Sequence, residues 1–124
     1  MMTARPGQSP QRVLIVEDEF FIADSLAAAF SIVGVEVIGP AYTIAQALAF
    51  VKAGRIHGAI LDINLRGEAA FSVADALSAN NIPFLFTTGY DVQQLDGKYQ
   101  HIIRFEKPFD PARVVAVLLK DMVR

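Results

Sequence analysis

Carboxylate, hydroxyl and ammonium side chains follow short apolar segments of this chain, each at the point where a segment ends. They are Glu17, Asp18, Asp62, Thr88 and Lys107. Two carboxylates about 4 Å apart repel each other by roughly 4 kcal/mol at an effective dielectric of about 20, so a cluster needs a cation or a shifted pKa. The chain has no cysteine, and hard oxygen ligands of this kind suit Mg²⁺. We therefore predict a magnesium site here, to which the main-chain carbonyl of Asn64 can add a ligand.

The same residues favour phosphoryl transfer. A metal ion and the ammonium group of Lys107 can neutralise the charge on the transferring oxygens, and the Thr88 hydroxyl can bind one of them. A carboxylate such as that of Asp62 can act as the nucleophile, because carboxylates accept phosphoryl groups and form acyl phosphates. The residue types therefore predict an aspartyl phosphate at Asp62.

Simpler roles stay open at this point for several of these residues. Asp62 could cap a following helix. Asp18 and Glu19 could form a solvated acidic turn at a helix start, where carboxylates interact favourably with the helix dipole, and this is our interpretation of Glu19. Lys107 could be an ordinary surface lysine, although the proline that follows it argues for a fixed turn.

Five apolar segments alternate with patterns of helical spacing, and this alternation indicates how the polar residues meet. The segments span 13–16, 35–38, 59–61, 84–86 and 102–105. Continuous apolar runs of this length are typical of parallel strands covered on both faces. We predict an α/β fold with a doubly wound, five-stranded parallel sheet, in which ligands bind at the carboxyl ends of the strands. The fourth helix, within 91–101, is expected to be weak because that stretch has little apolar periodicity.

Composition narrows the class of protein. Apolar residues make up 53% of the chain and charged residues 19%, which excludes a disordered protein. The formal net charge of −2 gives no sign of nucleic-acid binding, and no apolar run reaches the roughly 20 residues of a membrane span. The absence of cysteine favours a cytoplasmic location. We predict a flexible N-terminal arm over 1–11 and a single domain over 12–124.

From residue 12 to residue 124 the chain resembles a response-regulator receiver domain of two-component signalling. The segments that carry the resemblance are VLIVEDE at 13–19, AILDINL at 59–65, FLFTTGY at 84–90 and FEKPF at 105–109. Their order and spacing together are more specific than any one of them. The stretch PFLFTTGYD is similar to receivers of the FATGUY type, which are often stand-alone proteins. The resemblance implies a flavodoxin-like (βα)5 fold with strand order 2-1-3-4-5.

The resemblance also implies the phosphodonor and the metal ligands. Asp62 would receive its phosphoryl group from a phosphohistidine of a sensor histidine kinase or a histidine phosphotransfer protein. Glu17, Asp18, Asp62 and the main chain of Asn64 would organise Mg²⁺. The protein would be a signalling receiver and not an enzyme.

Further implied roles concern the phosphoryl oxygens and the switch. The resemblance assigns Thr88 and Lys107 to the phosphoryl oxygens and implies a cis peptide bond before Pro108. Many receivers carry an aromatic switch residue three positions before the lysine, where this chain has Arg104. We expect Tyr90 to take over that signalling role.

A partner surface is expected over 91–123, formed by the loop at 91–101, the fifth strand and the last helix. An apolar stripe of Val115, Leu119 and Val123 would serve a homodimer or a kinase there. Two other functions were weighed. A docking module that works without phosphorylation is favoured by Arg104, whereas a Mg²⁺ phosphohydrolase is disfavoured because Asn64 stands where such enzymes carry a second acid.

Overall fold

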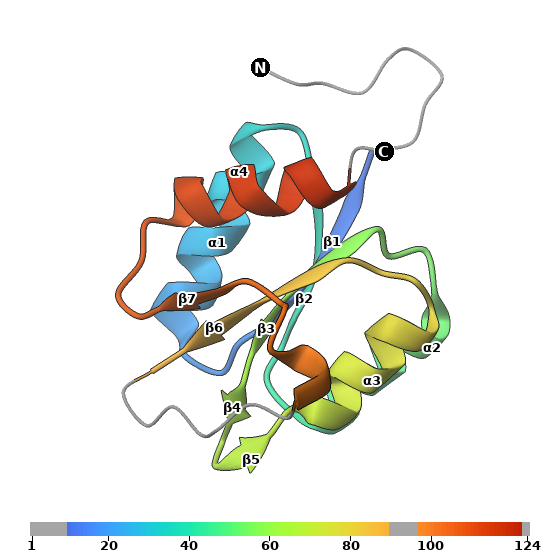
Figure 1. The fold of residues 1–124 in the computed structure, drawn as a ribbon. Helices are drawn as coiled ribbons and strands as arrows, with labels where there is room; N and C mark the ends of the chain where they lie inside the picture. Colours follow the sequence, from blue (N-terminus) through green and yellow to red (C-terminus); the bar gives the residue numbers. More distant parts are fainter. Residues whose placement is uncertain (1–9, 90–96, 123–124) are drawn as a thin grey trace.

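The computed structural model describes residues 10–89 and 97–122, and its centre is a five-stranded parallel sheet (Figure 1). The strands are β1 (Arg12–Val16), β2 (Glu36–Ala41), β3 (Gly58–Asp62), β6 (Phe84–Thr88) and β7 (Arg104–Glu106). They lie in the order β2-β1-β3-β6-β7. When these five strands alone are counted along the chain, the order is 2-1-3-4-5, so the predicted flavodoxin-like topology is confirmed.

Helices cover both faces of the sheet (Figure 1). Helices α1 (Phe20–Ile32) and α4 (Pro111–Met122) pack on one face, and α2 (Ile44–Ala53) and α3 (Phe71–Ala79) pack on the other. Each face has its own apolar core, with Ile60 on the α1 and α4 side and Leu61 on the α2 and α3 side. None of the helices in 10–89 and 97–122 is long and apolar enough to cross a membrane.

Side-chain caps set the start of two helices. The Thr43 side chain accepts a hydrogen bond from the Gln46 main-chain N–H at 3.1 Å, and the Gln46 side chain accepts one from the Tyr42 N–H at 2.8 Å. At the start of α4, Asp110 accepts from the Ala112 N–H at 3.1 Å, ahead of the first-turn proline. Polar residues at these positions satisfy amide groups that have no partner within the helix.

Strand β2 is longer than predicted. It continues through Gly39 and the cis-peptide Pro40 to Ala41, whose carbonyl accepts a hydrogen bond from the Glu17 N–H at 3.0 Å. The pairing with β1 shifts register after Leu14 to accommodate these residues. Glycine is required at position 39, because φ is +92° and a Cβ atom there would lie 2.7 Å from the Ala41 nitrogen.

A short hairpin follows β3 and was not predicted. Strands β4 (Asn64–Leu65) and β5 (Glu68–Ala69) pair antiparallel across a turn in which Arg66 and Gly67 both have positive φ values, 52° and 83°. A two-residue hairpin turn of type I′ requires this backbone conformation at both central positions. The hairpin lies directly after the carboxyl end of β3.

The connection from β6 to β7 has little regular structure in its described part. Residues 97–122 include one 3₁₀ turn before β7, Gly97–Tyr99, and no α-helix there. The Tyr99 side chain is buried, with its ring stacked on Phe71 and edge-on to Phe84 and Phe86. A weak fourth helix was expected within 91–101; its first part, 91–96, lies outside the described residues, and in 97–101 the buried Tyr99 ring covers the sheet and no α-helix forms.

Candidate functional site

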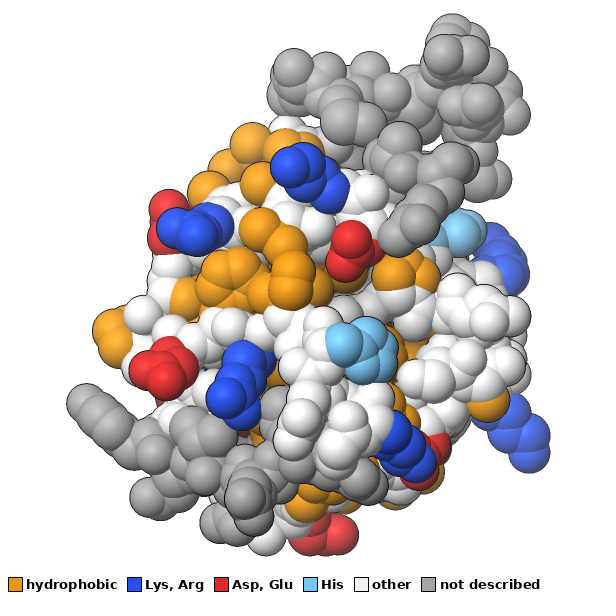
Figure 2. Space-filling model, viewed as in Figure 1, with side chains coloured by type: hydrophobic (Ala, Val, Ile, Leu, Met, Phe, Trp, Pro, Cys, Tyr) orange, Lys and Arg blue, Asp and Glu red, His pale blue; other side chains and the backbone are white. Residues whose placement is uncertain are grey.

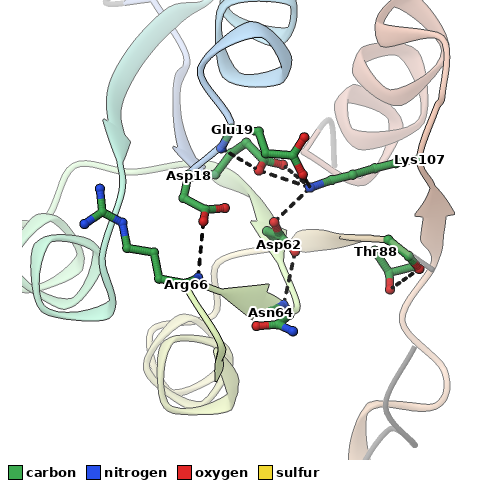
Figure 3. Close-up of polar contacts among 9 residues, drawn as sticks. Asp18, Glu19, Asp62, Asn64, Arg66, Thr88 and Lys107 are labelled. Carbon is green, nitrogen blue, oxygen red and sulfur yellow. Dashed lines mark hydrogen bonds and ion pairs between the residues drawn. The ribbon is translucent and has the colours of Figure 1, made fainter. Parts of the chain in front are cut away.

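Three carboxylates meet at the carboxyl ends of β1 and β3. The two strands pair in parallel with Val16 opposite Leu61, so the residues that come next lie at the same edge of the sheet. Glu17, Asp18 and Asp62 each offer one oxygen, and these oxygens lie within 4.8 Å of one another. The predicted meeting of these acidic side chains is confirmed (Figure 3).

Lys107 follows β7, the edge strand of the sheet, and its side chain extends into this cluster. Its Nζ atom lies 2.9 Å from Asp62 Oδ2, 3.0 Å from Glu17 Oε1 and 3.1 Å from Glu19 Oε1. The Lys107 main-chain N–H donates to the Thr88 carbonyl at 2.8 Å, and the peptide bond to Pro108 is cis, as expected. Lys107 is therefore held at the site by both its backbone and its ammonium group.

Burial gives the cluster unusual proton affinities. Burial and, secondarily, the neighbouring Asp62 carboxylate raise the pKa of Glu17 to about 8, although hydrogen bonds from Glu19 and Lys107 oppose the shift. Burial alone would lower the pKa of Lys107, but its contacts with Asp62 and Glu17 raise that pKa above its ordinary value. The lysine is thus positively charged at neutral pH and stands among four carboxyl groups, of which the buried Glu17 keeps its proton, so acidic groups still outnumber the single cation.

Main-chain N–H groups orient the carboxylates. The Glu19 N–H donates to Glu17 at 3.1 Å, and the Asn64 N–H donates to Asp62 at 3.1 Å. The Arg66 N–H, in the hairpin turn, donates to Asp18 at 3.3 Å. Three oriented carboxylates form the hard-oxygen donor set that Mg²⁺ prefers. Glu17, Asp18 and Asp62 fit such an ion, which would neutralise charge on phosphoryl oxygens.

The Thr88 hydroxyl lies apart from the carboxylates (Figure 3). Thr88 ends β6, is buried, and donates to the Gly89 carbonyl at 3.4 Å. Thr87, opposite Asp62 in the strand register, is fully buried, and its hydroxyl has no hydrogen-bond partner among the described residues. The structure therefore brings Lys107 to Asp62 but leaves the Thr88 hydroxyl turned to its own neighbour.

The remaining predicted residues have mixed outcomes. Arg104 is exposed on β7, and Tyr90 lies outside the described residues. The prediction that Val115 contributes to an exposed stripe is wrong, because its side chain is 3% exposed and packs into the core beneath α4. Hydrophobic side chains do gather over α4 and β7 (Figure 2), where Ile103 is 48% exposed.

The contact between Glu19 and Lys107 was not predicted from the sequence. The interpretation of Glu19 as a helix-start residue is correct for the backbone, since Glu19 is the N-cap of α1, but its side chain makes no capping hydrogen bond. With Lys107 it lines a groove of about 530 Å³ whose other walls include Phe21, Ile22 and Phe109. Nothing local in the sequence signals this contact, because Glu19 and Lys107 are 88 residues apart.

No protein-family model matches the chain. Among curated proteins, it is 36% identical over 110 residues to the phyllosphere-induced regulator PhyR of Methylorubrum extorquens, an alignment of 86% of this chain and 41% of that protein. The chain spans less than half the length of the curated relatives it matches.

Solved structures agree. SdrG from Sphingomonas melonis Fr1 is 38% identical, with a TM-score of 0.76 over 94% of this chain and 100% of that one. The BeF3-activated conformation of SdrG, from Pseudomonas melonis Fr1, has a TM-score of 0.69 at 37% identity over 94% of this chain and 100% of that one. The response regulator PhyR from Brucella abortus is 30% identical, with a TM-score of 0.76 over 92% of this chain and 50% of that one. With this similarity and an acidic cluster beside a lysine, the chain belongs to the response-regulator receiver family of two-component signalling.

Proposed function

We propose that this chain is a phosphoacceptor receiver, in which Asp62 takes a phosphoryl group from the phosphohistidine of a sensor histidine kinase or a histidine phosphotransfer protein. One observation carries the proposal: Asp62 lies 2.9 Å from the Lys107 ammonium and shares a cluster with Glu17 and Asp18. A nucleophilic carboxylate, a fixed cation and two further acids at one rim are the parts that transfer to aspartate requires.

In the transfer, an Asp62 oxygen forms a bond to phosphorus while the bond from phosphorus to the histidine nitrogen breaks. Lys107 then shifts its contact from the Asp62 carboxylate to the new phosphoryl oxygens. The Thr88 hydroxyl leaves the Gly89 carbonyl, to which its bond is long at 3.4 Å, and donates to another phosphoryl oxygen. Mg²⁺, held by Glu17, Asp18, Asp62 and the Asn64 carbonyl, would supply additional neutralising charge.

The SdrG relative supports this proposal. Its BeF3-activated conformation has been solved, and beryllofluoride is a mimic of a phosphoryl group.

We further propose how the phosphoryl group is read. Movement of Thr88 and Lys107 would act on the segment between them, with Tyr90 and Arg104 as the switch candidates and PFLFTTGYD as a FATGUY-type motif. The output surface would be the 91–123 face, including the exposed Ile103, and would serve a homodimer or another protein. We place this receiver domain at 12–124, in the cytoplasm.

The phosphodonor protein would approach over the rim beside α1. Phe20 and Phe21 are 61% and 82% exposed there, and Phe21 also lines the groove that Lys107 borders. Apolar side chains next to a charged site are suited to docking a partner helix.

The test is labelling of Asp62. With Mg²⁺ and acetyl phosphate, the wild-type protein should gain one phosphoryl group that hydroxylamine removes, as seen by intact mass. Asp62→Asn should gain none, whereas Asp24→Asn, an exposed change on α1, should label normally. Full labelling of Asp62→Asn would exclude Asp62 as the acceptor.

A docking module that works without phosphorylation is the second candidate, and exposed Arg104 in place of an aromatic switch residue favours it. Titration with Mg²⁺ and beryllofluoride distinguishes the two. A receiver that switches should show NMR shift changes across 88–107, whereas a passive docking module should change only at the rim.

A further inference from the structure

The Glu19 carboxylate is committed to Lys107 and not to the cation site. Glu19 is the N-cap residue of α1, where a side-chain oxygen normally accepts from the first helical N–H groups, yet it makes no such bond. Its Oε1 atom lies 3.1 Å from Lys107 Nζ instead. The cation cluster is complete without it, since that cluster consists of Glu17, Asp18 and Asp62.

Glu19 also differs from the other partners of Lys107 in its exposure. The Glu17 and Asp62 side chains are 0% and 4% exposed, whereas the Glu19 side chain is 60% exposed. Glu19 lines the groove beside the site together with Lys107 and Gly89. Of the three carboxylates on the lysine, Glu19 is therefore the one that a phosphodonor in solution meets first.

A negative charge in this position acts on the donor in two ways. It repels the donor's phosphoryl group, more strongly as the donor's own negative charge increases. It also competes with that group for the Lys107 ammonium, which the phosphoryl oxygens need. A protein donor can offset both effects with its interface, but a small molecule binds through its phosphoryl group alone.

We propose that Glu19 is a specificity-determining residue that disfavours small, highly charged phosphodonors at Asp62; this inference rests on the proposed phosphoacceptor function. Acetyl phosphate carries two negative charges at neutral pH, and its transfer forms the bond from Asp62 to phosphorus, breaks the phosphorus–oxygen bond and releases acetate. Phosphoramidate carries one net negative charge, and its transfer breaks the phosphorus–nitrogen bond and releases ammonia. Glu19 therefore slows the first reaction more than the second.

The experiment measures labelling rate constants for both donors at saturating Mg²⁺. Glu19→Gln should accelerate labelling by acetyl phosphate about fivefold and by phosphoramidate about twofold, as expected for removal of a partly screened charge. The gap between wild type and variant should shrink at high salt. Glu19→Asp should keep the wild-type ratio of the two rates, because the charge is retained.

Glu36→Gln is the matched control. Glu36 is an exposed glutamate in an ion pair, 2.8 Å from Arg12, at the amino-terminal start of β2 and away from the rim. Its substitution should leave both rates unchanged. Equal acceleration of both donors by Glu19→Gln, or none, would overturn the inference.

Two further readouts separate the possible failures. If neither donor labels the wild-type protein or Glu19→Gln, the proposed function fails; if both donors label both proteins and the ratio does not respond to Glu19→Gln, only this inference fails. Calorimetry should show a Mg²⁺ affinity for Glu19→Gln within about threefold of wild type, since one exposed charge is lost. A loss as large as that of Asp18→Asn would mean that Glu19 acts through the metal, which contradicts the inference.

Discussion

Two lysine–carboxylate contacts in this molecule use the same chemical groups in different surroundings. At the rim, the Lys107 side chain is 12% exposed and contacts Glu17 and Asp62, which are almost completely buried. Beside the 3₁₀ turn, Lys98 and Asp75 meet at 2.9 Å, but their side chains are 57% and 52% exposed. Geometry alone would rank the two contacts as equal.

The proton affinities show how far they differ. Burial raises the pKa of Glu17 to about 8, so its charged form is disfavoured at the rim. The pKa of Asp75 is lowered instead, because hydrogen bonds from Tyr99 and Lys98 favour its charged form. At the buried contact negative charge is therefore costly and a cation would favour it, whereas the exposed contact is an ordinary surface pair.

Substitution of Lys107 should have the largest effect on stability and should show the difference between the two contacts most clearly. Without Mg²⁺, Lys107→Met should destabilise the protein by about 3 kcal/mol, because buried carboxylates lose their counter-charge. Added Mg²⁺ should restore part of the loss. Urea unfolding measures both values, and Lys98→Met at the exposed pair should cost far less. Equal losses for the two variants would mean that burial does not distinguish the contacts.

The pH dependence of stability should show an intermediate effect. The folded protein binds a proton on Glu17 that the unfolded chain releases above its ordinary pKa of 4.5. The stability contributed by neutral Glu17 is therefore complete below pH 4.5 and is lost as pH rises through about 8. The slope is at most about 1.4 kcal/mol per pH unit. Glu17→Gln should flatten this slope in unfolding measured without Mg²⁺ from pH 5 to 9, and an unchanged slope would locate the proton elsewhere.

Tyr99→Phe should have the smallest effect on stability. It tests the exposed contact at Asp75. The ring stays among Phe71, Phe84 and Phe86, but the hydroxyl that donates to Asp75 is lost, which should lower stability slightly. The stability from charged Asp75 is present above its ordinary pKa of 3.8 and is lost as pH falls through its folded value. Unfolding curves of wild type and variant should thus differ at pH 7 and converge in strong acid. A constant difference would contradict the role of the Asp75 charge.

The features that general rules of parallel sheets determine could be predicted from the sequence. Apolar runs between helical patterns predict a doubly wound parallel sheet, and the resemblance to receivers implies its strand order, which places the residues after the first and third strands at one edge. The meeting of Asp18 with Asp62 follows from this topology. The caps at Thr43 and Asp110 were also predictable, because they depend on neighbours within three residues.

Very short strands and contacts that depend on the conformation of a long side chain could not be predicted. The strands of the β4–β5 hairpin are two residues each, too short for any periodicity, and Arg66–Gly67 is not a typical hairpin turn. The contact of Glu19 with Lys107 depends on the conformation of the long lysine side chain at the carboxyl ends of the strands. Val115 was misplaced because the apolar positions of the last helix are too many to identify a single exposed stripe.

The hairpin contributes to the site through its backbone. Its amides at Asn64 and Arg66 hold Asp62 and Asp18, and every amino acid except proline provides such an amide. The side chains of both residues are exposed. Selection can therefore alter the ribbon's outward chemistry, and with it the proteins that recognise this rim, without disturbing the orientation of the two acids beneath.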